Sequence, residues 1–184
     1  MTSRLQPAKA TPTKARNKVD ATNATNAADA SSLFLVNQMC FAIYSTSLAM
    51  TKLYRPLLSQ LGLTYPQYVV LLALWERDQL TVSALGEQVA LDSGTLTPLL
   101  KRLQSQGLIE RERSADDERQ VYIRLTRQGH SLKKKAEAIH EHIACAAQCS
   151  SAERKALTRA LQKLRTSLLA NSASAVSTLR AVRN

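Results

Sequence analysis

Apolar residues recur every three or four positions along much of this chain, which is the spacing of amphipathic helices. The first such stretch extends from Asn37 to about Leu61. Asn37 is a suitable N-cap, Gly62 is a suitable terminator, and Pro56 should kink the helix or mark its last turns. These signals predict one long helix.

A second helix should begin at Thr64, which forms a capping-box pattern with Gln67, and continue to Trp75. It is apolar on nearly every side, so we expect it at the centre of the fold. Two short amphipathic helices should follow, the first capped by Thr81 and the second by Asp92 or Ser93. A brief polar turn between two such helices is typical of a helix-turn-helix.

The apolar period then changes to two, over Leu108–Arg113 and again over Val121–Leu125, with a polar loop between them. A hairpin after a helix-turn-helix is the wing of a winged helix. Thr126 should cap a further helix, and the Ser150–Glu153 capping box should begin the last one. The expected fold is mainly α, with a small β-hairpin wing.

This pattern divides the chain into five segments. The long terminal helices lack a partner within so small a domain, so they should pair with a second subunit. The segments are a disordered basic tail (1–31), an N-terminal helix (32–62), the winged helix-turn-helix (63–127), C-terminal dimerisation helices (128–170) and a flexible tail (171–184).

The net charge of +11 favours an acidic partner such as nucleic acid, although +9 of it lies in residues 1–31 and 151–184. No apolar run is long enough to cross a membrane, and residues 1–31 lack the apolar core of a signal peptide. We therefore expect a cytoplasmic protein.

The second helix of the helix-turn-helix and the wing should contact double-stranded DNA. Recognition helices place their first residues against base edges, and wing arginines can enter the minor groove. In the wing, Asp117 should orient Arg119. A merely solvated surface is the alternative for these side chains. The candidates are Ser93, Gly94, Thr95, Thr97, Pro98, Lys101, Arg102, Arg111, Asp117 and Arg119.

Three cysteines, Cys40, Cys145 and Cys149, are too few for a disulfide framework. They make no recognisable zinc pattern with the histidines, so neither a metal nor a cofactor is expected. With Asn37 as the N-cap, Cys40 lies in the first turn, where the helix dipole stabilises a thiolate. An earlier start of the helix would weaken that argument.

Several segments resemble the MarR family of regulators, and most closely its organic-hydroperoxide-sensing branch. The resemblance covers roughly residues 33–168. The more specific motifs are Asn-Gln-Met-Cys at 37–40 and Asp-Ser-Gly-Thr-Leu-Thr-Pro at 92–98. Further similarity lies in 50–58, in 63–68 and in the wing motif Asp-Asp-Glu-Arg at 116–119.

The resemblance implies a homodimeric repressor, not an enzyme, that releases its operator when an organic hydroperoxide oxidises Cys40. It implies that Tyr54 and Tyr65 hydrogen-bond that cysteine. It further implies that Cys145, or less favourably Cys149, of the other subunit then forms a disulfide with Cys40. Tyr44 is better interpreted as an interface or core aromatic residue with a satisfied hydroxyl.

Tyr54 follows Cys40 by fourteen residues, which is roughly 21 Å along a straight helix. We therefore expect the sensor site to be shared between subunits. Two alternatives remain open: a repressor released by a small phenolic ligand, and a thiol-dependent peroxidase.

Overall fold

The computed structural model describes residues 33–115, 117 and 119–182, with side chains as far as residue 171. The predicted disordered tail at 1–31 lies outside these residues, as do the acidic wing residues Asp116 and Glu118. The chain divides into two compact units after Leu48. Each unit is described by itself.

Within residues 33–48, the first unit holds a short 3₁₀ turn, Leu35–Asn37, and the beginning of α2 (Met39–Ser59). The turn forms because the Asn37 and Gln38 N–H groups donate to the carbonyls of Phe34 and Leu35, at 2.9 and 3.1 Å. The Gln38 carbonyl then accepts the first helical bond, from Ala42 N–H at 3.0 Å. The helix thus begins one residue later than predicted, and Gln38 rather than Asn37 precedes it.

The second unit holds the rest of α2 and all later elements. Pro56 lies inside α2, three residues before its end, and Gly62 adopts the left-handed conformation (φ 68°) in the turn that follows. The later elements are α3 (Tyr65–Glu76), β1 (Leu80–Thr81), α4 (Val82–Val89), α5 (Ser93–Ser105), β2 (Ile109–Arg113), β3 (Val121–Leu125), α6 (Arg127–Ala146) and α7 (Ser151–Val182).

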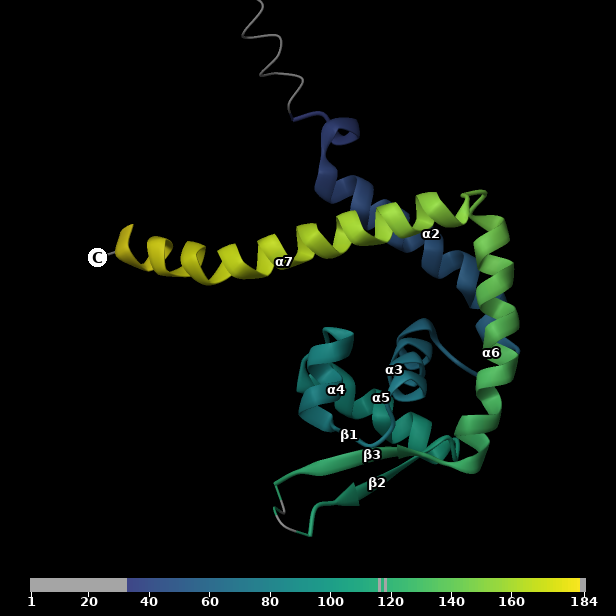
Figure 1. Cartoon of the computed structure of the whole chain (residues 1–184). Helices are drawn as coiled ribbons and strands as arrows, with labels where there is room; N and C mark the ends of the chain where they lie inside the picture. The colour runs from purple at the N-terminus through teal and green to yellow at the C-terminus, as the bar shows by residue number, and fades with distance from the viewer. Residues whose placement is uncertain (1–32, 116, 118, 183–184) are drawn as a thin grey trace, which may run out of the picture. The chain divides into compact units, whose positions relative to one another are not determined.

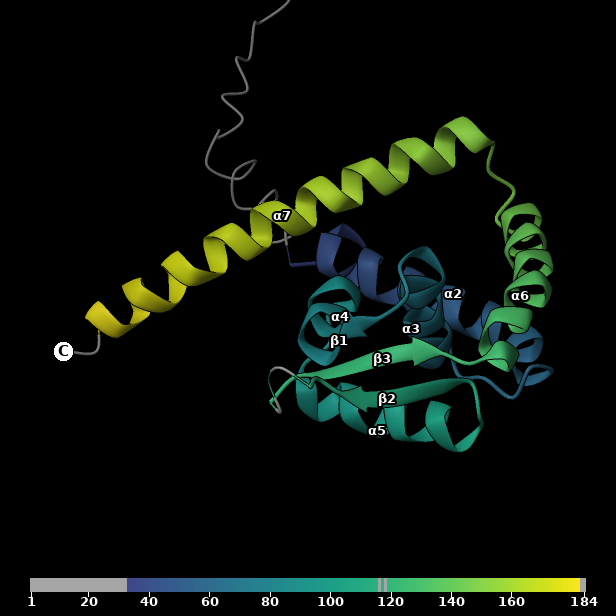
Figure 2. The same cartoon turned by 60° about the horizontal axis from the view of Figure 1, so that its bottom comes forward.

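A three-stranded antiparallel sheet in the order β1-β3-β2 completes the winged helix-turn-helix (Figure 1). The hairpin of β2 and β3 is the predicted wing, and Figure 2 shows it running alongside α5. Strand β1 pairs Leu80 with Ile123 and Thr81 with Tyr122. Sequence periodicity missed β1 because two residues are too few to show alternation.

The core forms around α3, as its apolar sequence predicts, and includes the buried stripe of α5. The largest fully buried side chains from these two helices are Tyr68, Val70, Leu71, Leu74, Leu96, Leu100 and Leu103. Each fully buried aliphatic side chain of this size contributes about 1.5–3 kcal/mol to folding. This packing fixes α5 against α3 and holds the opposite face of α5 towards solvent.

The predicted caps position the later helices. Thr81 accepts the Ala84 N–H at 3.2 Å at the start of α4, and Thr126 accepts the Gly129 N–H at 3.0 Å at the start of α6. At the start of α7, Glu153 accepts the Ser150 N–H at 2.8 Å, which completes the second capping box.

Helix α7 continues through the segment that the sequence predicts as a flexible tail from residue 171. Residues 171–182 are mostly alanine, serine, leucine and valine, with no glycine or proline to end a helix. In the described part of the chain, no helix combines the length and apolarity that a membrane span requires.

Candidate functional site

The turn between α4 and α5 is tight, and the small residues Gly86 and Ala90 allow the backbone to approach closely there. Ala90 adopts the left-handed conformation (φ 58°), and a Cβ on Gly86 would lie only 2.9 Å from the Leu91 carbonyl oxygen. Glycine is therefore the residue that lets α4 approach the turn. This close approach sets the position from which α5 begins.

Asp92 fixes the first turn of α5. One carboxylate oxygen accepts the Thr95 N–H at 2.9 Å, and the other accepts the Thr95 hydroxyl at 2.8 Å. These two bonds hold the pKa of Asp92 below its usual value. Of the two caps left open by the sequence, Asp92 is the one used.

The face of α5 opposite its buried leucines presents the predicted DNA-contacting residues. Thr97 is half-covered because it borders the buried stripe, whereas the other candidates on the helix are exposed. The exposed set is Ser93, Gly94, Thr95, Pro98, Lys101 and Arg102. Short side chains at the start of the helix and two cations near its end suit close approach to a polyanion.

The wing carries the last three predicted residues, Arg111, Asp117 and Arg119. Asp117 and Arg119 are exposed at the loop, and the Asp117 carboxylate accepts the backbone N–H of Arg119 at 3.0 Å and the Gln120 amide at 3.2 Å. This carboxylate therefore holds the backbone at Arg119 through its N–H. Arg111 is half-buried on β2 and lines the same pocket as Arg119.

The two tyrosines predicted to serve the cysteine lie together in the second unit. The ring centroids of Tyr54 and Tyr65 are 5.0 Å apart, and that of Tyr68 is 5.7 Å from Tyr54. Burial raises the pKa of Tyr54 to about 12, with smaller contributions from Tyr68 and Tyr65. The Tyr54 phenol is therefore a hydrogen-bond donor throughout the neutral range.

Sequence reasoning did not include Tyr68 and Trp75 in this cluster. The Tyr68 ring lies 6.3 Å from Trp75, and the indole N–H of Trp75 donates to the Gly129 carbonyl at 3.0 Å. Burial also raises the pKa of Tyr68. The spacing of Tyr65, Tyr68 and Trp75 on one helix was the available signal.

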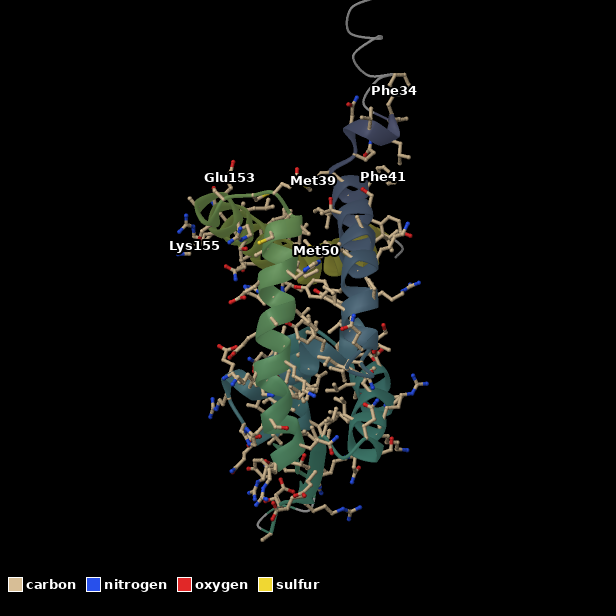
Figure 3. The ribbon with its side chains drawn as sticks, turned by 90° about the vertical axis from the view of Figure 1, so that its right-hand side faces the viewer. Phe34, Met39, Phe41, Met50, Glu153 and Lys155 are labelled. Carbon is tan, nitrogen blue, oxygen red and sulfur yellow. The ribbon has the colours of Figure 1, made fainter. Side chains whose placement is uncertain are left out.

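Cys40 is the second residue of α2 and is exposed. The prediction had placed it third, but both assignments leave it in the first turn. It is surrounded in sequence by exposed apolar side chains, including Phe34, Met39 and Phe41, which project from the ribbon in Figure 3.

The other two cysteines lie near the end of α6. Cys145 is the penultimate residue of that helix, and Cys149 lies in the turn before α7. Both are exposed, and the Cys149 thiol contacts the Ala147 carbonyl oxygen at 3.1 Å. Among the described residues, His, Cys, Asp and Glu side chains do not gather into a group of three that could hold a metal ion.

A groove of about 480 Å³ lies between α3 and α6. Tyr68, Leu72 and Trp75 form its apolar wall. Its polar lining is mainly acidic, with Glu76, Glu137 and Glu141 beside His140 and Lys133. The excess of carboxylates favours a cationic or neutral occupant over an anionic one.

Known proteins that are similar to this chain are transcriptional regulators. The family model described as transcriptional regulator SarA/Rot matches residues 52–136. The organic hydroperoxide resistance transcriptional regulator of Bacillus subtilis (strain 168) is 53% identical over 130 residues, covering 71% of this chain and 88% of the relative.

Solved structures of AbfR from Staphylococcus epidermidis are also similar. Reduced AbfR bound to DNA is 37% identical, with a TM-score of 0.63, over 77% of this chain and 99% of the other. The disulfide-formed AbfR is 37% identical, with a TM-score of 0.54, over 78% and 98%. These relatives are named as transcriptional regulators or solved on DNA, in agreement with the expectation of a regulator rather than an enzyme.

Proposed function

This chain belongs to the MarR family of transcriptional regulators, in its organic hydroperoxide resistance branch, and we propose from that premise that it is a redox-switched repressor. Reduced protein holds an operator, and oxidation of Cys40 by an organic hydroperoxide releases it, which derepresses a peroxidase gene. The observation that carries the proposal is an exposed cysteine in the first turn of α2, in a chain that also holds the rings of Tyr54 and Tyr65 together.

The DNA-binding surface is the exposed face of α5 together with the wing. Ser93, Gly94 and Thr95 approach base edges at the start of the helix, followed by Thr97 and Pro98. Lys101 and Arg102 contact phosphates, and Arg119 enters the minor groove from a loop that Asp117 shapes. Arg111 contributes charge at the base of the wing.

The active form is a homodimer. On α7, Leu157, Leu161 and Leu168 follow helical spacing and are 58%, 45% and 57% exposed. An apolar stripe of this kind is stable in water when a second helix covers it. The exposed apolar residues of segment 33–48 add to the same interface.

The sensor combines Cys40 of one protomer with Tyr54 and Tyr65 of the other. Fourteen residues separate Cys40 from Tyr54, and both belong to α2, whose rise is about 1.5 Å per residue. A crossing of two α2 helices would bring each cysteine to the tyrosine pair of the second chain. Two phenol donors then stabilise the thiolate that reacts with peroxide.

The chemistry is a two-electron oxidation. The Cys40 thiolate attacks the terminal oxygen of the hydroperoxide, the O–O bond breaks, and the alkoxide leaves and takes up a proton as an alcohol. Sulfur is oxidised to sulfenic acid while the peroxide is reduced. A second thiol then attacks the sulfenic sulfur, water leaves and a disulfide forms.

We assign the second thiol to Cys145 of the partner chain, with Cys149 as the alternative. Both are exposed, so neither needs local unfolding to react. A disulfide requires the two Cα atoms to be within about 7 Å. The oxidised dimer must therefore bring the α2 N-terminus of one chain against the end of α6 in the other, and this movement changes the spacing of the two α5 helices.

Release by a small phenolic ligand is the alternative. The groove between α3 and α6 is the natural candidate for such a ligand. Its three glutamates would repel a phenolic carboxylate but not a neutral phenol. The exposed Cys40 needs no such ligand to act as a sensor.

The test uses a 30-bp duplex selected from a random pool by the reduced wild-type protein. Cumene hydroperoxide should release this duplex from wild type, whereas Cys40→Ser should stay bound. Cys145→Ser and Cys149→Ser are treated with peroxide in parallel and run on a non-reducing gel. The variant that loses the covalent dimer identifies the second thiol of the disulfide. Peroxide release of the duplex from Cys40→Ser would eliminate the redox mechanism.

A further inference from the structure

We propose that a pocket between the wing and the N-terminus of α4 binds a phosphate oxyanion, supplied by the DNA backbone, with Arg111 as its central cation. This inference rests on the proposed DNA-binding function and assigns a specific task to a part of it. The pocket joins the wing to the helix-turn-helix, so a phosphate seated in it would be held by both.

The pocket has a volume of about 550 Å³. Thr81, Val82 and Ser83 line it from the end of β1 and the start of α4, while Arg111 and Arg119 line it from the wing. Two of its described lining residues are cationic and none is acidic. Its chemistry therefore selects an anion.

Arg111 occupies a position where an apolar residue would be expected. In the β2–β3 register it pairs with Ile123, which in turn pairs with Leu80 of β1. Cross-strand partners lie on one face of a sheet, and on this face Ile123 and Leu80 are buried. The stem of Arg111 thus lies against the core side of the sheet.

The Nε of Arg111 is buried, and no acceptor among the described residues reaches it. A buried donor without a partner costs free energy, so such a group in a folded protein calls for an explanation. A leucine or methionine would fill this place on the sheet without that cost. An oxyanion in the pocket would offset part of this cost by neutralising the guanidinium that carries the buried donor.

The start of α4 adds to the positive potential of the pocket. Thr81 Oγ1 already accepts the Ala84 N–H, but the N–H groups of Val82 and Ser83 belong to the first turn, where a helix offers no internal acceptor. The positive end of the helix dipole is unfavourable for a nearby guanidinium. An anion between them would interact favourably with both.

The DNA backbone is the source of phosphate that fits this location. In a helix-turn-helix the second helix enters the major groove, while the first crosses the backbone. The N-terminus of α4 is the start of that first helix, and Arg119 belongs to the wing loop beside it. Inorganic phosphate shares the same chemistry, and the experiment separates the two.

The experiment measures binding of the reduced protein to a random-sequence 30-bp duplex between 0.05 and 0.3 M KCl. Arg111→Met removes the charge but keeps an apolar stem. The slope of log K against log salt should become shallower by about 0.9 for each lost phosphate contact, and affinity at 0.1 M should fall about eightfold per contact. Arg111→Lys keeps the charge and should keep the slope.

Arg124→Met is the matched control. Arg124 lies on the other face of the hairpin, 3.5 Å from the Glu112 carboxylate, and should leave the salt slope unchanged. The melting temperature separates binding from folding. Arg111→Met should melt at or above the wild-type temperature because it removes a buried donor, whereas a purely structural role predicts a lower one.

An unchanged salt slope in Arg111→Met would overturn the proposal. If, in addition, inorganic phosphate stabilised wild type but not Arg111→Met at matched ionic strength, the pocket would belong to the free anion and the assignment to DNA would be wrong. Failure of wild type to bind any duplex is a different result, because it would overturn the proposed function itself.

Discussion

The ring of Tyr54 lies against that of Tyr65, with centroids 5.0 Å apart and planes tilted by 54°. Helix α2 supplies the first tyrosine and the first residue of α3 supplies the second. Two phenols at this separation can donate to a single acceptor. The pair is therefore the part of the proposed sensor that one protomer already assembles.

Replacing either tyrosine by phenylalanine should slow the oxidation of Cys40. The ring and its packing stay, and only the hydroxyl donor to the thiolate is lost. A hydrogen bond to a charged group contributes about 1.5–3 kcal/mol, so the rate should fall at least about tenfold for each variant. The oxidation rate is measured in a stopped-flow experiment as the loss of free thiol after mixing with cumene hydroperoxide.

Tyr68→Phe is the control for this series, because Tyr68 is almost fully buried in the same cluster and is not assigned to the thiolate. Its oxidation rate should match wild type. Equal slowing by Tyr68→Phe would show that the cluster matters through packing rather than through its two donors.

Tyr54 should make the fold sensitive to alkaline pH. Its pKa is about 12 in the folded protein, above the usual value of 10.0, so the folded state holds this proton more tightly than the unfolded chain. The contribution to stability is complete below pH 10 and is lost as the pH rises from 10 towards 12.

Tyr54→Phe removes that titration and should move the alkaline unfolding midpoint, followed by circular dichroism, to higher pH. In an alkaline titration followed by absorbance at 295 nm, Tyr54→Phe should show one fewer late-ionising phenol than wild type. Tyr122→Phe on the wing serves as the control. Tyr68, whose pKa is also raised, should still ionise late in Tyr54→Phe. An undiminished number of late-ionising phenols in that variant would show that Tyr54 is not one of them.

Gly129→Ala should destabilise the fold because α6 meets the wing closely at this point. An added Cβ would lie 2.1 Å from the Leu108 carbonyl oxygen. The backbone must move, at a cost of about 1–3 kcal/mol. Urea unfolding measures this change, and Gln128→Ala, an exposed neighbour in the same turn, should change stability by less than about 0.5 kcal/mol.

Leu161→Asp should weaken the dimer. Leu161 is 45% exposed in the middle of the leucine stripe of α7, and a charge there would have to be buried on association. Analytical ultracentrifugation should show monomer at concentrations where wild type is dimeric. Gln162→Asp, one residue along the same helix, should stay dimeric; an unchanged Leu161→Asp dimer would exclude α7 from the interface.

Much of the DNA-binding domain was predictable because local rules and tertiary packing agree there. The caps at Thr81, Thr126 and Ser150 come from side chains that bond their own helix, and the leucine spacing of α5 indicates its buried face. The two-residue apolar period likewise predicted the hairpin of β2 and β3, because the local pattern there agrees with the side of the sheet that packs on the core.

Three features were missed, two because they depend on contacts between distant residues and one because a local turn changes where a helix begins. Strand β1 exists only through its pairing with β3. The Asp78 carboxylate accepts the Leu125 N–H at 2.9 Å, 47 residues away in sequence. Helix α2 begins at Met39 because Asn37 is the last residue of the preceding 3₁₀ turn. The preference of asparagine for N-cap positions does not reveal this turn.

The sensor shared between protomers is tested most directly with two mixed dimers that each keep one Cys40. In the first, Cys40→Ser is paired with Tyr54→Phe, so the remaining cysteine faces an intact Tyr54 on the other chain. In the second, a wild-type chain is paired with the double variant Cys40→Ser/Tyr54→Phe. The remaining cysteine then faces a chain that lacks the Tyr54 hydroxyl. The account predicts oxidation by cumene hydroperoxide at the wild-type rate in the first and about tenfold slower in the second. The reverse order, or equal rates, would contradict it.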